Sequence, residues 1–430
     1  MQRLINARTL ALSIISLNSV SLHAGFDLNR LQGWWSQHGA ITVKDVATAR
    51  AQRAANNEVF EFFEPVLPLL PAPPLIPYTE DQLRDLLEVP DSVLINDFRI
   101  DASLAFDRAY FEVKPRMKLT KEYFERGPKD GDERSDTDWY INEWVAQVFV
   151  RDDLSLSYGR EDLQWGPSFL LSPSNPFDSF NGREDPKTEV DGADYVKLVW
   201  TPDYSWTFSL IANTSEGLKE NQRSFEEIYA FKVDYLFDRG NVSAILSTTD
   251  EKKPEVTTGD YDTGDRLGAY LSYNLTDAFI GYVEGSASEQ DEEVLLGGSY
   301  TFNSGLSINV EYFYNSTGID GYSEEPPVEV LSYLPELFEQ YFNASNRETF
   351  LLQNYTLLQV FQSDVIGSLD TLGRFTYNWD DDSWSALGHL EFDLNDYMQV
   401  FASGTLFSDD KGELDALREY WVQIGLEFTY

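Results

Sequence analysis

The chain has 430 residues, no cysteine, and 73 acidic against 32 basic residues, which gives a formal net charge of −41 at pH 7. Phosphate backbones are bound by clustered basic groups, so this charge argues against a nucleic-acid partner. The lack of cysteine excludes disulfide scaffolds, thiolate metal sites and cysteine nucleophiles. Aromatic residues make up 14% of this polar, acidic chain, a composition that favours an outer-membrane β-barrel over a helical membrane protein.

The first 24 residues have the features of a secretory signal peptide. Arg3 and Arg8 precede a mostly apolar stretch over residues 9–22, and Ala24 supplies a small residue at the expected cleavage point. No later window offers the roughly 18 uninterrupted apolar residues that a membrane-spanning helix requires. We therefore predict a signal peptide over residues 1–24 and export of the remaining chain.

Residues 25–106 differ from the rest of the chain and are predicted to form an N-terminal extension. The apolar residues of 43–63 have helical spacing, and residues 65–77 read PVLPLLPAPPLIP, which suits neither a central strand nor a helix interior. The sequence predicts a partly helical, proline-rich segment. Its position as a periplasmic extension, a plug or a long loop is left open.

Residues 107–430 show a period of two instead. The last segment illustrates it, because Val422, Ile424 and Leu426 alternate with Gln423 and Gly425 up to the chain end. Segments of this kind recur at lengths that suit a tilted strand crossing a bilayer, and their connections alternate between short and long. We predict an all-β, transmembrane antiparallel β-barrel of about 16 strands, with 18 as the alternative.

Two stretches carry a resemblance to known proteins. Residues 158–180 read YGREDLQWGPSFLLSPSNPFDSF and precede VDGADYVKLVW, and the chain ends on the aromatic Tyr430. The first resembles a motif in porin-like outer-membrane barrels, with local similarity to barrels of polysaccharide export and capsule assembly. The last strand is similar to the one by which outer-membrane assembly machinery recognises its substrates. The resemblance implies the outer membrane of a Gram-negative bacterium.

Charged residues in the expected strands fall on the face opposite the apolar one. Phe111 and Leu119 share one face of their strand, for example, while Lys114 and Arg116 share the other. A lysine or arginine facing lipid at the midplane costs about 2–4 kcal/mol, so these side chains should face the lumen. The residues predicted on this basis to line the pore are Glu112, Lys114, Arg116, Lys118, Lys197, Lys232, Asp234, Glu311, Asp370, Arg374, His389 and Glu391.

The connection at residues 164–189 is the predicted constriction. It is rich in proline and in large apolar residues, which makes it a poor solvated tip, so folding into the barrel would bury its apolar part. An outer loop packed on its neighbours is the alternative. The residues predicted to line the constriction are Trp165, Arg183, Glu184, Asp185 and Lys187.

Catalysis and metal binding have weak sequence support. His389 lies near Glu391 on one strand face, but no serine in a strained Gly-x-Ser-x-Gly turn accompanies it, so no catalytic residue is predicted. The acidic stretch GDYDTGD lacks the ligand spacing of a calcium-binding loop. We predict no cofactor and no metal site, while binding of Ca²⁺ or Mg²⁺ between acidic surface loops and lipopolysaccharide phosphates is left open.

These features predict a porin-like channel for diffusion or selective passage of small hydrophilic solutes. An exporter or surface-assembly barrel for an exopolysaccharide or capsule is the alternative, in which residues 25–92 would contact periplasmic machinery. Acidic pore mouths accumulate cations, which favours cation passage, while the basic run of residues 114–118 opposes it. The expected partners are outer-membrane lipid, lipopolysaccharide and the assembly machinery, and a homo-oligomer is left open.

Overall fold

A computed structural model describes most of the chain as one barrel. The described residues are 37–54, 90–125, 130–177, 186–215, 217–218, 227–249, 265–288, 292–316, 352–408 and 418–430. The compact unit Ile41–Tyr430 contains all but the first two residues of the barrel, and only residues 37–40 are described in the other unit, Met1–Ala40. The predicted signal peptide lies outside the described residues. Among the described residues, no helix has the length and apolar character needed to cross a membrane.

Within these residues, 18 strands form a single antiparallel sheet. Their bounds are β1 (Gly39–Ala54), β2 (Ser92–Ala105), β3 (Ala109–Tyr123), β4 (Glu133–Arg151), β5 (Leu154–Glu161), β6 (Ala193–Trp200), β7 (Trp206–Ser215), β8 (Ile228–Phe237), β9 (Gly240–Thr249), β10 (Arg266–Asn274), β11 (Phe279–Ala287), β12 (Glu292–Thr301), β13 (Ser307–Asn315), β14 (Asn354–Gln362), β15 (Leu369–Asn378), β16 (Trp384–Asn395), β17 (Met398–Phe407) and β18 (Arg418–Thr429).

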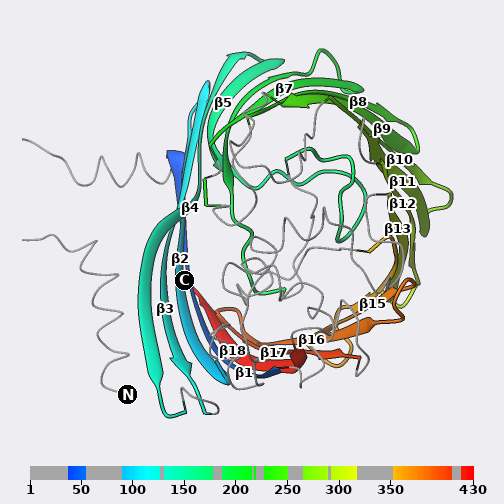
Figure 1. Ribbon diagram of the computed structural model, residues 1–430. Helices are drawn as coiled ribbons and strands as arrows, with labels where there is room; N and C mark the ends of the chain where they lie inside the picture. Colours follow the sequence, from blue (N-terminus) through cyan, green and yellow to red (C-terminus); the bar gives the residue numbers. More distant parts are fainter. Residues whose placement is uncertain are drawn as a thin grey trace, which may run out of the picture. The chain divides into compact units, whose positions relative to one another are not determined.

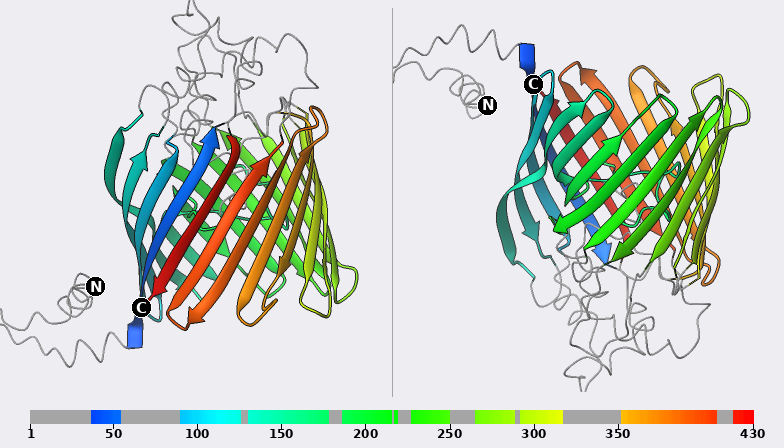
Figure 2. Two further views of the ribbon diagram at one scale, coloured as in Figure 1. Left: turned by 90° about the horizontal axis from the view of Figure 1, so that it is seen from below. Right: turned by 90° about the horizontal axis from the view of Figure 1, so that it is seen from above.

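The sheet closes on itself because the first strand pairs with the last. β1 pairs with β18 from Lys44 opposite Thr429 to Ala54 opposite Arg418, and it also pairs with β2. Figure 1 shows the ring of strands, and Figure 2 shows β1 in blue lying beside β18 in dark red along the tilted wall. Every strand is therefore paired on both sides, as a barrel in a membrane requires.

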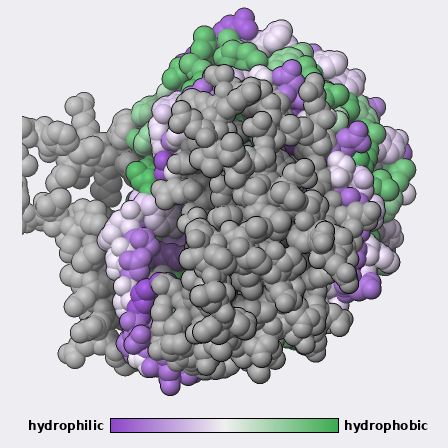
Figure 3. All heavy atoms as spheres, in the orientation of Figure 1, coloured by the Kyte–Doolittle hydropathy of each residue, from purple (hydrophilic) through white to green (hydrophobic). Residues whose placement is uncertain are grey.

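Alternation along the strands separates an apolar exterior from a polar lumen. In β7 Leu210 is exposed, whereas its neighbours Ser209 and Ile211 are buried. Figure 3 shows hydrophobic residues, in green, along the visible flank of the barrel. Near the short turns a row of aromatic rings runs from Trp200 through Trp206 to Tyr273. Such a girdle marks a membrane interface.

The N-terminal region departs from its predicted structure. Residues 43–54, predicted to be part of a helix, belong to β1, and residues 92–105 form β2, so the barrel starts before residue 107. Alanine-rich residues are good helix formers, but pairing with β18 and β2 on both sides overrides this local preference. These two strands raise the count from the predicted 16 to the alternative of 18. The proline-rich residues 65–77 lie outside the described residues.

The pairing of β2 with β3 is interrupted near its middle. Arg99 pairs with Arg116 and Ala102 with Val113, while the residues between them, which include Pro115, are skipped. Proline has no amide hydrogen, so it cannot donate to the ladder. The Arg116 side chain fills the gap, because its Nη1 donates to the carbonyl oxygens of Ile100 at 2.8 Å and Pro115 at 3.1 Å.

Candidate functional site

The residues predicted to line the pore all lie in strands. Several of them alternate with exposed apolar neighbours, as Glu311 does with Val310 and Tyr312, and these lie on the inward face. The predicted residues are Glu112, Lys114, Arg116 and Lys118 in β3, Lys197 in β6, Lys232 and Asp234 in β8, Glu311 in β13, Asp370 and Arg374 in β15, and His389 and Glu391 in β16. Many are paired with an opposite charge, as Lys114 is with Glu143 at 3.0 Å.

The connection between β5 and β6 enters the lumen. Figure 1 shows its described parts as green coil inside the ring of strands. We call residues 165–177 the N-terminal limb and residues 186–190 the C-terminal limb. The residues between them, including the predicted constriction residues Arg183, Glu184 and Asp185, lie outside the described residues.

Two buried carboxylates of the wall hold the N-terminal limb. Glu284 of β11 accepts hydrogen bonds from the hydroxyls of Ser172 and Ser174, both at 2.7 Å. Glu311 of β13 accepts one from the amide of Phe169 at 2.8 Å and one from the hydroxyl of Tyr282 at 2.7 Å. Both carboxylates have a residue exposure of 1% or less, so their hydrogen bonds form away from bulk water.

A glycine allows the N-terminal limb to approach Glu284. Gly166 has a φ of +85°, a conformation that residues with a side chain rarely adopt. A Cβ atom at this position would lie 2.4 Å from the Glu284 carboxylate. The glycine in the sequence motif therefore has a structural reason, which is the close contact between the backbone and the carboxylate.

Apolar packing covers the same limb. Leu170 and Leu171 join a buried cluster with Tyr282, Leu295, Phe313, Leu352, Tyr355 and Leu357 of the wall. Trp165 and Phe177 pack against buried residues of β6 to β10, with their rings 5.8 Å apart. This burial explains why a loop with so many large apolar residues is stable inside a polar barrel.

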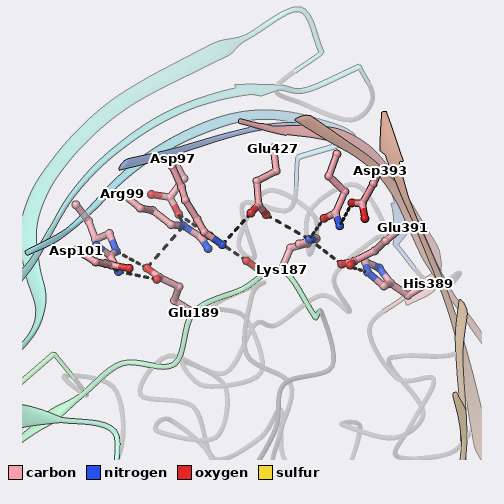
Figure 4. Close-up of polar contacts among 12 residues, drawn as sticks. Asp97, Arg99, Asp101, Lys187, Glu189, His389, Glu391, Asp393 and Glu427 are labelled. Carbon is pink, nitrogen blue, oxygen red and sulfur yellow. Dashed lines mark hydrogen bonds and ion pairs between the residues drawn. The ribbon is translucent and has the colours of Figure 1, made fainter. Parts of the chain in front are cut away.

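The C-terminal limb is held by ion pairs. Glu189 receives a bidentate contact from Arg116, at 2.6 Å from Nε and 2.8 Å from Nη2, and Arg116 also pairs with Asp101 at 2.9 Å. Arg99 donates to the carbonyl oxygen of Lys187 at 2.9 Å. The Lys187 ammonium reaches β16 to β18 instead, as Figure 4 shows. The predicted residue Lys187 thus links the loop to the wall.

Several residues of this arrangement were missed from the sequence. Arg99 falls within the predicted N-terminal extension. The other three, Glu284, Gln399 and Glu427, lie on inward strand faces, and the loop residues that they contact are distant in the sequence. The alternation of strand residues identifies them as inward-facing. No local signal identifies which of them touch the loop.

His389 lies in a short chain of polar contacts. Its Nδ1 is 2.6 Å from the Ser403 hydroxyl and its Nε2 is 2.8 Å from Glu391. A nucleophilic serine must be accessible to its substrate, whereas Ser403 is 6% exposed and also accepts a hydrogen bond from Gln423 at 3.3 Å. The contacts therefore fit a structural network. Among the described residues, no group of acidic or histidine side chains has the arrangement of a metal site.

No family model and no curated protein matches the chain. Among solved structures it is similar to Pseudomonas aeruginosa OccK5 (OpdH), with a TM-score of 0.52, 10% identity and coverage of 91% of this chain and 97% of that one. It is also similar to Pseudomonas aeruginosa OccK7 (OpdD), with a TM-score of 0.50, 9% identity and coverage of 91% and 99%. A triple mutant of Rhodopseudomonas blastica porin matches with a TM-score of 0.41, 12% identity and coverage of 91% and 100%.

These likenesses concern the fold alone. They agree with the closed antiparallel sheet described above, which confirms the β-barrel fold class predicted from the sequence. The chain has a porin-like β-barrel fold.

Proposed function

We propose that the protein is an outer-membrane channel through which small hydrophilic solutes pass, and that the loop between β5 and β6 narrows its lumen. The observation that carries this proposal is the attachment of both limbs to inward-facing side chains of the wall, at Glu284 and Glu311 and at Arg116. A barrel of 18 strands is too wide for side chains alone to fill. A loop that enters such a lumen reduces its width and brings charged groups towards the path of a solute.

The charge of the chain favours cations as the preferred solutes. Acidic residues outnumber basic ones by 73 to 32 in the whole chain. Two members of the basic run predicted to oppose this preference are neutralised, since Lys114 pairs with Glu143 and Arg116 pairs with Glu189 and Asp101. Fixed negative charge at a pore raises the local concentration of cations.

The test is planar-bilayer recording of the refolded mature protein. We expect stable conductance steps, and in a salt gradient a reversal potential whose sign shows cation preference. Replacing Lys114, Arg116 and Lys118 by Glu should increase this preference. Electrically silent insertion of a correctly folded barrel would overturn the proposal, and anion preference would overturn its charge argument.

The position of residues 39–54 weakens the alternative of an export barrel. That alternative assigned residues 25–92 to contacts with periplasmic machinery, whereas residues 39–54 of that segment form wall strand β1. We also propose that the protein does no catalysis of its own.

A further inference from the structure

The ammonium group of Lys187 occupies a site built by three strands of the wall. Its Nζ lies 2.7 Å from Glu391 of β16, 2.7 Å from Gln399 of β17 and 3.3 Å from Glu427 of β18. Nζ also lies 5.0 Å from the centre of the Phe401 ring. An ammonium has three N–H donors, so three oxygen acceptors and an aromatic ring satisfy it fully.

The acceptors are held in place by a second layer of contacts. Gln399 donates its amide N–H to Asp393 at 3.0 Å, and because a carboxylate only accepts, the carbonyl oxygen of Gln399 is turned towards Lys187. His389 contacts the Glu391 carboxylate at 2.8 Å. The site is therefore oriented by wall residues, independently of the loop.

The loop does not depend on this ammonium for its position. The backbone carbonyl of Lys187 is bound by Arg99, and two residues later Glu189 is bound by Arg116. The Lys187 side chain is 13% exposed and that of Glu391 is 25% exposed, so water reaches both. The ammonium can leave the site while the backbone of the C-terminal limb remains attached.

The site carries excess negative charge once Lys187 is taken away. Glu391, Glu427 and Asp393 then face a single wall lysine, Lys44, which binds the other oxygen of Glu427 at 2.9 Å. Among the described residues named here, three carboxylates stand against the one ammonium of Lys44. Such a site attracts a cation and repels an anion.

We propose that Glu391, Gln399, Phe401 and Glu427 form a binding site for the primary ammonium group of a passing solute, and that Lys187 is a tethered occupant which the solute displaces. This inference rests on the proposed channel function and names the solute class, which is small organic amines carrying a primary ammonium. The aromatic ring and the three acceptors suit an alkylammonium better than an alkali metal ion, which is coordinated by oxygens alone.

The experiment uses n-butylammonium, which reproduces the end of a lysine side chain, and titrates it calorimetrically into the refolded protein in detergent. Lys187→Ala empties the site, so we expect this variant to bind n-butylammonium at least about tenfold more tightly than the unaltered protein does. Adding Glu391→Gln and Glu427→Gln to that variant should abolish the gain. Butyrate, of equal length and opposite charge, should not bind.

Lys197→Ala is the matched control. Lys197 is also an inward-facing wall lysine paired with a carboxylate, Glu161, but its partner has no oriented amide or ring described beside it. We expect no gain in n-butylammonium binding there. Equal binding by all variants, or an equal gain in Lys197→Ala, would overturn the inference. Should Lys187→Ala not refold, Lys187→Ser carries the same expectation.

Planar-bilayer recording separates this inference from the function on which it rests. If Lys187→Ala conducts and n-butylammonium reduces its current at lower concentrations than in the unaltered protein, both stand. Binding without any conductance would overturn the channel function and leave the site. Conductance without binding would overturn the site and leave the channel.

Discussion

The two limbs of the lumenal loop are attached in different ways. In the N-terminal limb, uncharged hydroxyl and amide groups donate hydrogen bonds to the buried wall carboxylates Glu284 and Glu311, among large apolar side chains. Charged groups bind the C-terminal limb, and most of them are partly exposed, such as Glu189 at 25%. Salt screens exposed charges but not buried hydrogen bonds. Salt should therefore weaken the attachment of the C-terminal limb but not that of the N-terminal limb.

We expect the largest loss of stability on replacing Arg116, the buried charged residue that binds the C-terminal limb. The Arg116 side chain is 2% exposed, pairs with Glu189 and Asp101, and fills the break between β2 and β3. Arg116→Met leaves Asp101 without this ion pair and Glu189 with only the longer contact to Arg99 at 3.7 Å, and it should lower the free energy of unfolding by about 3–5 kcal/mol. Urea unfolding in detergent measures it. A loss below about 1 kcal/mol would show that the break needs no cation.

The N-terminal limb can be broken at Glu284. Glu284→Ala leaves the hydroxyls of Ser172 and Ser174 without their buried acceptor and should cost about 2–3 kcal/mol in the same unfolding experiment. Glu284→Gln keeps one acceptor oxygen and should cost less. Because these bonds are buried, the loss should be the same in 0.1 M and 1 M salt, and a salt-dependent loss would contradict the comparison.

Gly166→Ala tests the close approach of the same limb. It combines an unfavourable φ of +85° with a clash against Glu284, and should cost about 1–3 kcal/mol. Gly305→Ala is the matched control, because Gly305 has a φ of +86° but open space around its missing Cβ. The excess cost at Gly166 measures the contact. Equal costs would mean that the limb can shift away from the wall.

The smallest effect is expected at Lys187. Lys187→Ala removes partly exposed ion pairs to Glu391 and Glu427 and should cost less than about 1 kcal/mol in low salt. In 1 M salt the difference from the unaltered protein should vanish, since screening weakens the same pairs. A loss of stability that persists in 1 M salt would show that the contacts of Lys187 behave like the buried hydrogen bonds of the N-terminal limb.

Period-two alternation predicted most of the wall because each strand carries that signal within itself. Lys197 and His389 could be assigned to the lumen from their immediate neighbours alone. β1 could not, because its alanines favour a helix locally and only β18, at the other end of the chain, makes it a strand. Because the predicted N-terminal extension includes β1 and β2, Arg99 of β2 was not predicted to face the lumen.

In the loop too, local sequence predicts some features, while others depend on contacts with distant parts of the chain. Its composition predicted entry into the lumen, and Trp165 and Lys187 do contact the wall. Their partners, Ile211 and Glu427 among them, lie on strands separated by long stretches of sequence. Contacts of this kind follow from the closure of the barrel, which fixes the strands that face each other across the lumen, and no local pattern encodes that.

The pairing of β1 with β18 has a consequence for biogenesis. Tyr430 exchanges backbone hydrogen bonds with Val43, at 2.8 and 3.4 Å, so the sheet closes only once the strand furthest along the chain has paired with β1. Until β18 is in place, the margins of the sheet at β1 and β17 are unpaired and liable to aggregate. A chain that ends before β18 leaves β1 without this partner, so both unpaired margins persist.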